Sequence, residues 1–273
     1  MGLRVNTNIA SMTAQRQMQV VTRRLGENYS RLASGLRIAS AADDAAGLAI
    51  SERMRSQIRS YSVAARNAQD GISMGQTAEG ALNEVSNTLG RMRELAMQAA
   101  NGTLTTQDRT TMDTEYQALS AEISRIASQT EFNGIALLDG SVSSTLIQVG
   151  IDASQTISIV NQDVTVSSLG MGTSNVTTIS NSSAALATID TAINTVNTAR
   201  GNLGAAQNRM QSALASILNA RENLSAAESR IRDVDVASET ADLTRNSIMQ
   251  QAAVSVLQQA NVQPQIALSL LQG

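Results

Sequence analysis

A hydrophobic heptad repeat in the second half of the chain limits the fold more than any other feature. From residue 186 to residue 231, positions taken alternately three and four residues apart fall into two heptad columns, one apolar throughout and one mixed. Such a repeat predicts a coiled-coil seam on one helix, roughly 70 Å long at about 1.5 Å per residue. The unbroken column consists of Ile189, Val196, Leu203, Met210, Ile217, Leu224 and Ile231.

The helix that pairs with this seam is expected earlier in the chain. Apolar residues at steps of three and four run from Ile58 to Ala99, with one phase shift near Gly75. This pattern predicts a long helix that ends at the turn signal Asn101-Gly102. A shorter amphipathic segment follows it. The helices are therefore expected at about residues 44–100, 105–129 and 184–231.

The middle of the chain has a different pattern. Residues 144–150 and 155–160 alternate apolar and polar side chains, which predicts a β-hairpin within a β region at 137–166. Residues 167–183 are rich in Ser, Thr, Asn and Gly, so an exposed loop is expected there. Two Asn-x-Ser/Thr triplets in that loop allow glycosylation, but such triplets are common in a chain of this composition.

The two ends of the chain are weakly amphipathic and rich in Ala, Gln and Asn. Their apolar stripes are too narrow to hold isolated helices in water, so each needs the other end or other copies of the chain. The predicted fold is mainly α: a long coiled-coil rod folded back on itself, with a small β-hairpin region and paired terminal helices. We expect terminal helices at 1–33 and 236–273, connectors at 34–43 and 232–235, and a rod at 44–231.

The residue inventory leaves little room for catalysis. The chain has no Cys, which excludes disulfides and thiolate chemistry, and no His, which removes the commonest general base and transition-metal ligand. It also has no Lys, so all 20 basic residues are Arg. No Gly-rich phosphate loop, zinc spacing or Ser/His/Asp set is present, so we expect no catalytic residue, cofactor or metal. The net charge of −3 gives no attraction to nucleic acid or anionic lipid. No apolar run is long enough for a membrane span or a secretory signal.

Adjacent carboxylates at Asp43 and Asp44 have three possible roles. They could form an acid/base pair, bind a metal, or cap the helix expected from about residue 44. Capping is favoured because carboxylates near a helix N-terminus accept hydrogen bonds from its free N–H groups. Ser40, three residues before Asp43, belongs to the same cap and connector.

A second group of candidate residues lies on the long early helix. Leu89 falls on the seam and is expected to pack, whereas Arg91 and Glu94 should face away from it. They form either a solvated face with i,i+3 charge pairs or a protein–protein surface, because an Arg flanked by Leu is a frequent interface anchor.

Several long stretches of the chain resemble bacterial flagellins. They are "SGLRIASAADDAAGLAISERMRSQIRS", "GALNEVSNTLGRMRELAMQAANGT", "TEFNGIALLDG", "IQVGIDASQTISI" and the segment from "SRIRDVDVASETADLTRNSIMQQ" to "LSLL". The resemblance covers residues 1–160 and 184–273 in the order of the family. Two differences are a variable middle of only about twenty residues, which implies that large outer domains are absent, and the ending "LLQG".

The resemblance implies a structural subunit that polymerises into the flagellar filament for swimming, and is secreted to the cell exterior. Its terminal helices would form an inner tube and its long helices the surrounding layer. Expected partners are other copies of the chain, an export chaperone, the export apparatus, the filament cap, junction proteins and the host Toll-like receptor for flagellin. The chaperone and the inner tube would use a C-terminal segment that includes Ile248, Ala252, Val256, Leu257 and Ala260.

The resemblance also assigns the second group of candidates to a subunit contact that the immune receptor recognises. The residues concerned are Leu89, Arg91, Glu94, Leu95 and Glu115. Two other functions remain open: a hook–filament junction protein, and a coiled-coil signalling protein, which would lack the β region and the weakly apolar ends. An enzyme is the least favoured interpretation.

Overall fold

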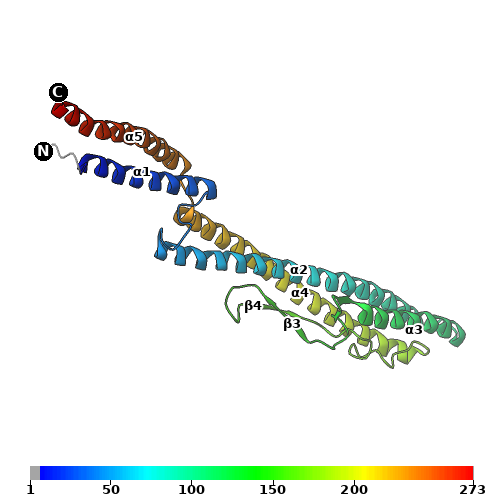
Figure 1. The fold of residues 1–273 in the computed structure, drawn as a ribbon. Helices are drawn as coiled ribbons and strands as arrows, with labels where there is room; N and C mark the ends of the chain where they lie inside the picture. The colour runs from blue at the N-terminus through cyan, green and yellow to red at the C-terminus, as the bar shows by residue number, and fades with distance from the viewer. Residues whose placement is uncertain (1–6, 273) are drawn as a thin grey trace. The chain divides into compact units, whose positions relative to one another are not determined.

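The structure is a computed structural model that describes the backbone of residues 7–272 and the side chains of residues 7–263, 265 and 266. Its described part is mainly helical, with two small antiparallel hairpins, which confirms the predicted fold class (Figure 1). The elements are α1 (Ile9–Ser34), α2 (Ala45–Ala99), α3 (Thr106–Gln129), β1 (Glu131–Phe132), β2 (Ile135–Ala136), β3 (Ser144–Gln148), β4 (Thr156–Val160), α4 (Ile179–Arg232) and α5 (Val236–Gln272).

The chain divides into two compact units. The terminal unit comprises residues 1–56 and 223–273, and the central unit comprises residues 57–222. Helices α2 and α4 each contribute to both units. Within the described residues, no helix is long and apolar enough to cross a lipid bilayer.

The core of the central unit lies between α2, α3 and α4. Leu82, Val85, Leu89 and Met92 of α2 are completely buried in one cluster that includes four residues of the α4 heptad column: Ile189, Val196, Leu203 and Met210. Along that column, five residues are at most 5% exposed, and Leu224 and Ile231 are half-buried in the terminal unit. The five buried members are Ile189, Val196, Leu203, Met210 and Ile217.

Hydrogen bonds fix the turn between α2 and α3. Thr105 and Asp108 form a capping box at the start of α3. The buried guanidinium of Arg109 donates from Nε to the carbonyl of Ala99 at 2.9 Å and from Nη2 to that of Asn101 at 2.8 Å. The first bond satisfies a carbonyl that α2 leaves free at its C-terminus, and the second holds the turn that follows.

The β region consists of two hairpins. Strands β1 and β2 are joined by Asn133 and Gly134, whose φ angles of 50° and 76° are those of a tight hairpin turn. Strands β3 and β4 pair antiparallel from Ser144↔Val160 to Gln148↔Thr156. Ile157 and Ile159 on one face of β4 are buried in the central core.

The prediction of an exposed loop at residues 167–183 is wrong in two respects. Leu169, Met171 and Val176 are at most 5% exposed and join the main core cluster, and α4 begins at Ile179 rather than near residue 184. The Tyr116 hydroxyl also lies 2.8 Å from Ser174 Oγ. The segment is polar in composition, but its few apolar side chains are spaced so that they cover the core.

In the terminal unit, α1 and α5 pack side by side in antiparallel directions (Figure 1). The segments that link them to the longer helices pair through their backbones. Arg37 N donates to the carbonyl of Arg232 at 2.7 Å, and Val234 N donates to that of Gly35 at 3.1 Å. Gly35, at φ 72°, supplies the left-handed residue that ends α1.

Candidate assembly and recognition surfaces

The paired aspartates are bound to the backbone at the start of α2. Asp43 Oδ2 accepts hydrogen bonds from Ser40 N and Ser40 Oγ, both at 2.9 Å. These bonds, first that from the Ser40 backbone, hold the pKa of Asp43 below its ordinary value. Asp44 Oδ1 accepts from Gly47 N at 2.9 Å, which is the geometry of a helix N-cap. The geometry is that of capping: Asp43 closes the preceding turn and Asp44 caps α2.

Arginine side chains surround the paired linkers of the terminal unit. Glu52 accepts hydrogen bonds from Arg232 at 2.6 Å and from Arg55 at 2.8 Å, and these bonds, that from Arg232 first, lower its pKa. Arg37 Nη2 donates to the carbonyl of Ile231 at 2.6 Å. These contacts tie Glu52 of α2 and the guanidinium of Arg37 to the last residues of α4, next to the paired linkers.

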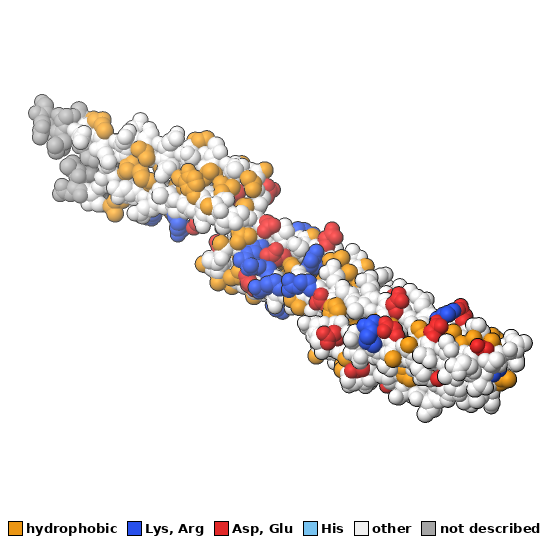
Figure 2. All heavy atoms as spheres, turned by 90° about the vertical axis from the view of Figure 1, so that its right-hand side faces the viewer, with side chains coloured by type: hydrophobic (Ala, Val, Ile, Leu, Met, Phe, Trp, Pro, Cys, Tyr) orange, Lys and Arg blue, Asp and Glu red, His pale blue; other side chains and the backbone are white. Residues whose placement is uncertain are grey.

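Helices α1 and α5 bury few apolar side chains against each other. Only Ala14, Val21 and Ala260 are both hydrophobic and buried among their described residues. Many larger side chains of the two helices are exposed, and the surface next to the grey terminal residues in Figure 2 is mostly uncharged, with hydrophobic side chains between polar ones. The large exposed residues are Ile9, Met12, Tyr29, Val236, Ile248, Val254, Val256, Val262 and Ile266.

The predicted C-terminal candidates fall on two sides of α5. Ile248 and Val256 are 61% and 55% exposed, and Ala252 is also exposed. Leu257 is half-buried and Ala260 is buried against α1. The first three residues therefore form an outward apolar stripe, while Ala260, whose carbonyl accepts a hydrogen bond from Asn8, belongs to the contact with α1.

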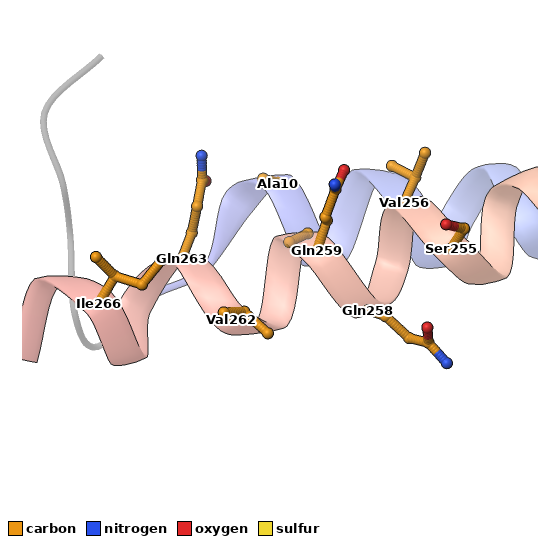
Figure 3. A pocket seen from close by; sticks show the side chains of 9 residues that line it. Ala10, Ser255, Val256, Gln258, Gln259, Val262, Gln263 and Ile266 are labelled. Carbon is orange, nitrogen blue, oxygen red and sulfur yellow. The ribbon is translucent and has the colours of Figure 1, made fainter.

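An open groove of about 580 Å³ runs along α5 beside Ala10 of α1. Val256, Val262 and Ile266 contribute apolar side chains to its lining. In Figure 3, Val256 and Gln263 point to one side of α5 and Gln258 to the other. The groove is shallow and mixed in polarity, and fits a packed side chain or helix better than a small molecule.

A charged face joins α2 to α3 in the central unit. Arg91 Nη1 lies 3.0 Å from Glu94 Oε2, and Arg91 Nη2 lies 2.9 Å from Glu115 Oε1. These carboxylates, Glu115 first, raise the pKa of Arg91. The three side chains are 51%, 70% and 47% exposed, so a partner can reach them.

Leu89 and Leu95 do not belong to that face. They are 0% and 2% exposed and lie in the main core cluster. The prediction that Leu89 and Leu95 belong to a contact surface is therefore wrong. Both residues lie on the inward side of α2, as the seam pattern predicts for Leu89. They hold the helix that presents Arg91 and Glu94.

Sequence reasoning missed the polar contacts between α1 and α5. Asn8 caps α1 through Ser11 N at 3.0 Å and also donates to the carbonyl of Ala260 at 2.7 Å. Asn28, Glu239 and Asn246 are buried in the same contact. The sequence contains no signal for them. A polar residue that faces a partner helix cannot be distinguished in the sequence from one that faces solvent unless the alignment of the two helices is known.

Long paired helices, a small β region and terminal helices with uncovered apolar side chains define a structural assembly subunit. Two family models match this chain: the bacterial flagellin N-terminal helical region over residues 5–143, and the C-terminal helical region over residues 186–271. The chain belongs to the bacterial flagellin family.

Individual relatives agree with this assignment. A flagellin of Halalkalibacterium halodurans is 45% identical over 269 residues, covering 98% of this chain and 99% of the relative. The flagellar filament 30.7 kDa core protein of Treponema maltophilum is 42% identical over 282 residues, covering 98% and 99%. The crystal structure of Bacillus cereus flagellin aligns with a TM-score of 0.52 at 36% identity, covering 56% of this chain and 88% of that one.

The chain is therefore a structural filament subunit and not an enzyme. Matches over nearly the full length do not favour a junction protein or a coiled-coil signalling protein. The short variable middle agrees with a flagellin of about this length.

Proposed function

We propose that this chain polymerises by burying the outward apolar side chains of α1 and α5 against other copies. The terminal helices form the inner tube of the filament, and residues 44–231 form the layer around it. The exposure of Ile9, Met12, Ile248, Val256 and their neighbours supports this proposal. Burying a large apolar side chain contributes about 1.5–3 kcal/mol. Covering most of this set therefore contributes on the order of 10 kcal/mol per subunit, before the costs of association.

Polar substitution in the outward stripe of α5 tests this proposal. The double variant Ile248→Gln, Val256→Gln is expected to raise the protein concentration needed for polymerisation at least about tenfold, since it removes several kcal/mol of apolar burial. Electron microscopy and sedimentation of polymer measure the effect.

A matched control carries Ile179→Gln, which changes an apolar side chain of α4 that is 46% exposed in the central unit. This variant should polymerise as the parent does. Normal polymerisation of the double variant would contradict the proposal, as would an equal loss in the control.

We further propose that the protein is secreted through the flagellar export apparatus and acts outside the cell. Its support is the membership of the bacterial flagellin family and the similarity to a flagellar filament core protein. Before export, the stripe formed by Ile248, Ala252 and Val256 needs a cover, and an export chaperone at this segment would supply it. The filament cap and the junction proteins are the partners at the two ends of the polymer.

The charged face at Arg91, Glu94 and Glu115 is proposed as a subunit contact and as the site that the host Toll-like receptor recognises in the monomer. Its support is the exposure of all three side chains and their fixed arrangement on α2 and α3. Leu89 and Leu95 act through the position of α2 and make no contact themselves.

Replacing Arg91 tests the recognition surface. Arg91→Ala should lower receptor activation by monomeric protein at least about tenfold, because truncation of an interface arginine often costs more than about 1.4 kcal/mol. Arg93→Ala is the control, since Arg93 pairs with Asp190 of α4 instead. A reporter-cell assay that shows equal activation by the Arg91 variant and the parent would refute the assignment.

A further inference from the structure

Three polar side chains are buried where α1 meets α5. Asn28 of α1 is 6% exposed, and Glu239 and Asn246 of α5 are each 8% exposed. Asn28 Nδ2 donates a hydrogen bond to Glu239 Oε1, and Asn246 Nδ2 donates to Asn28 Oδ1 at 2.8 Å. Both ends of the Asn28 amide are therefore engaged, one as donor and one as acceptor.

The arrangement depends on the alignment of the two helices. No ion pair among the described residues involves Glu239, so its carboxylate relies on the Asn28 amide. A buried polar group without its partner is costly, and a buried carboxylate more so. Glu239 and Asn246 are seven residues apart on α5, so a slide of α5 along α1 by one heptad would leave at most one of them beside Asn28. At least one of the two hydrogen bonds of the Asn28 amide would then be lost.

A second polar contact lies about five turns away along α1. Asn8 Nδ2 donates to the carbonyl of Ala260 at 2.7 Å, and Ser11 Oγ donates to Asn261 Oδ1 at 2.8 Å. Ser11 precedes Asn28 by 17 residues on α1, and its partner Asn261 follows Asn246, a partner of Asn28, by 15 residues on α5. Both contacts are therefore satisfied in the same antiparallel alignment.

Apolar packing discriminates little between alignments of this pair. Ala14 and Val21 of α1 and Ala260 of α5 are the buried hydrophobic residues of the two helices in the described part of the chain, and two of these three are alanines. Small side chains fit many opposing surfaces, so they tolerate a slide by one heptad. Buried polar residues are known to fix the register of paired helices at a cost in stability.

We propose that Asn28, Glu239 and Asn246 form a register lock that selects one alignment of α1 with α5. The proposal rests on contacts within one chain and does not depend on how the chain polymerises. Its consequence is that every copy presents the same apolar stripe, with the same residues of α1 beside the same residues of α5. A regular lattice needs such identical surfaces.

Engineered cysteines read this register directly, because the chain has no cysteine of its own. The pair Ser11→Cys, Asn261→Cys reports the observed alignment, since the two side chains are in hydrogen-bond contact. The pair Ser11→Cys, Val254→Cys reports a slide of one heptad. The polymer is oxidised and run on a non-reducing gel, which separates chains with an internal cross-link from chains that are cross-linked to each other by their size.

With Asn28, Glu239 and Asn246 unchanged, the pair Ser11→Cys, Asn261→Cys should form a cross-link within the chain, and the pair Ser11→Cys, Val254→Cys should form very little. The apolar triple variant Asn28→Leu, Glu239→Leu, Asn246→Leu should raise the yield of the shifted cross-link at least about tenfold, because a loss of more than about 1.4 kcal/mol of discrimination has that effect. Glu239→Gln is the matched control. Its amide oxygen can still accept from Asn28, so it should keep the parent's pattern.

A triple variant that forms only the observed cross-link would overturn the proposal. If that variant does not assemble, Asn28→Ala is used, since it removes both hydrogen bonds of the amide without adding bulk. The shifted cross-link should then rise above the parent's level. An unchanged pattern in Asn28→Ala would equally overturn the register lock.

Discussion

Several carboxylates of this protein accept well-placed hydrogen bonds that hold their pKa below its ordinary value. Ser40 lowers the pKa of Asp43, Arg232 that of Glu52 and Thr105 that of Asp108. Arg93 has the same effect on Asp190. Such groups stabilise the folded state fully above their ordinary pKa, and this contribution is lost as the pH falls through their lowered values.

The pH dependence of stability follows from these carboxylates and from Tyr116. The absence of His, Cys and Lys leaves no side chain to titrate between about pH 6 and pH 9. Burial raises the pKa of Tyr116, so its contribution is present below the ordinary tyrosine value and is lost as the pH rises through the raised one. The free energy of unfolding should therefore be flat from about pH 6 to pH 9, fall below about pH 4, and fall again above about pH 10.

Denaturant unfolding of the polymer-free protein, followed by circular dichroism at each pH, measures this profile. The terminal unit is monitored separately by the signal lost at low denaturant. A steep change in stability between pH 6 and pH 8 would contradict the prediction.

Single residues differed in how far the sequence alone could place them. Asp44 was predictable as a cap because its partner lies three residues away. Asn28 and Glu239 were not, because they meet across more than two hundred residues of chain. Leu89 and Leu95 entered the recognition surface by resemblance, whereas the position of each on α2 places it in the core.

Helix α2 approaches two other elements closely at Gly71. An added Cβ at Gly71 would lie 2.7 Å from Met210 Sδ and 3.0 Å from Ile147 Cγ1. At Gly80, in the same helix, a Cβ would meet nothing within 4 Å. The first glycine is needed for packing between α2, α4 and β3, and the second costs helix stability without a packing reason.

Substitution at these two glycines should have opposite effects. Gly71→Leu is expected to destabilise the central unit by about 1–3 kcal/mol through overpacking. Gly80→Ala should stabilise it by about 0.5–1 kcal/mol, the difference in helix propensity. Thermal unfolding followed at 222 nm measures both changes, and equal effects of one sign would contradict this account of α2.

Elements with a strong period were the most predictable from the sequence. The heptad pattern placed the long helices to within a few residues, and alternation placed the β3–β4 hairpin. The segment 167–183 was misjudged because its three buried residues are diluted by Ser, Thr, Asn and Gly. The three apolar residues can be recognised as core residues only when the surface that they cover is known.

At the scale of the whole molecule, the two units differ in what holds them together. The central unit has a continuous apolar core shared by α2, α3, α4 and the β region. The terminal unit depends on polar contacts and a few small apolar residues, and leaves its larger apolar side chains exposed. Under the proposal made above, these exposed side chains are the surface that other copies of the chain cover in the filament.

Amide hydrogen exchange, measured on dilute monomer and on polymer, tests the central claim most directly. We predict that amides of α1 and α5 exchange rapidly in the monomer and become strongly protected in the polymer, while those of the central core are protected in both. Helices α1 and α5 that are as well protected in the dilute monomer as in the polymer would contradict the claim that assembly stabilises them.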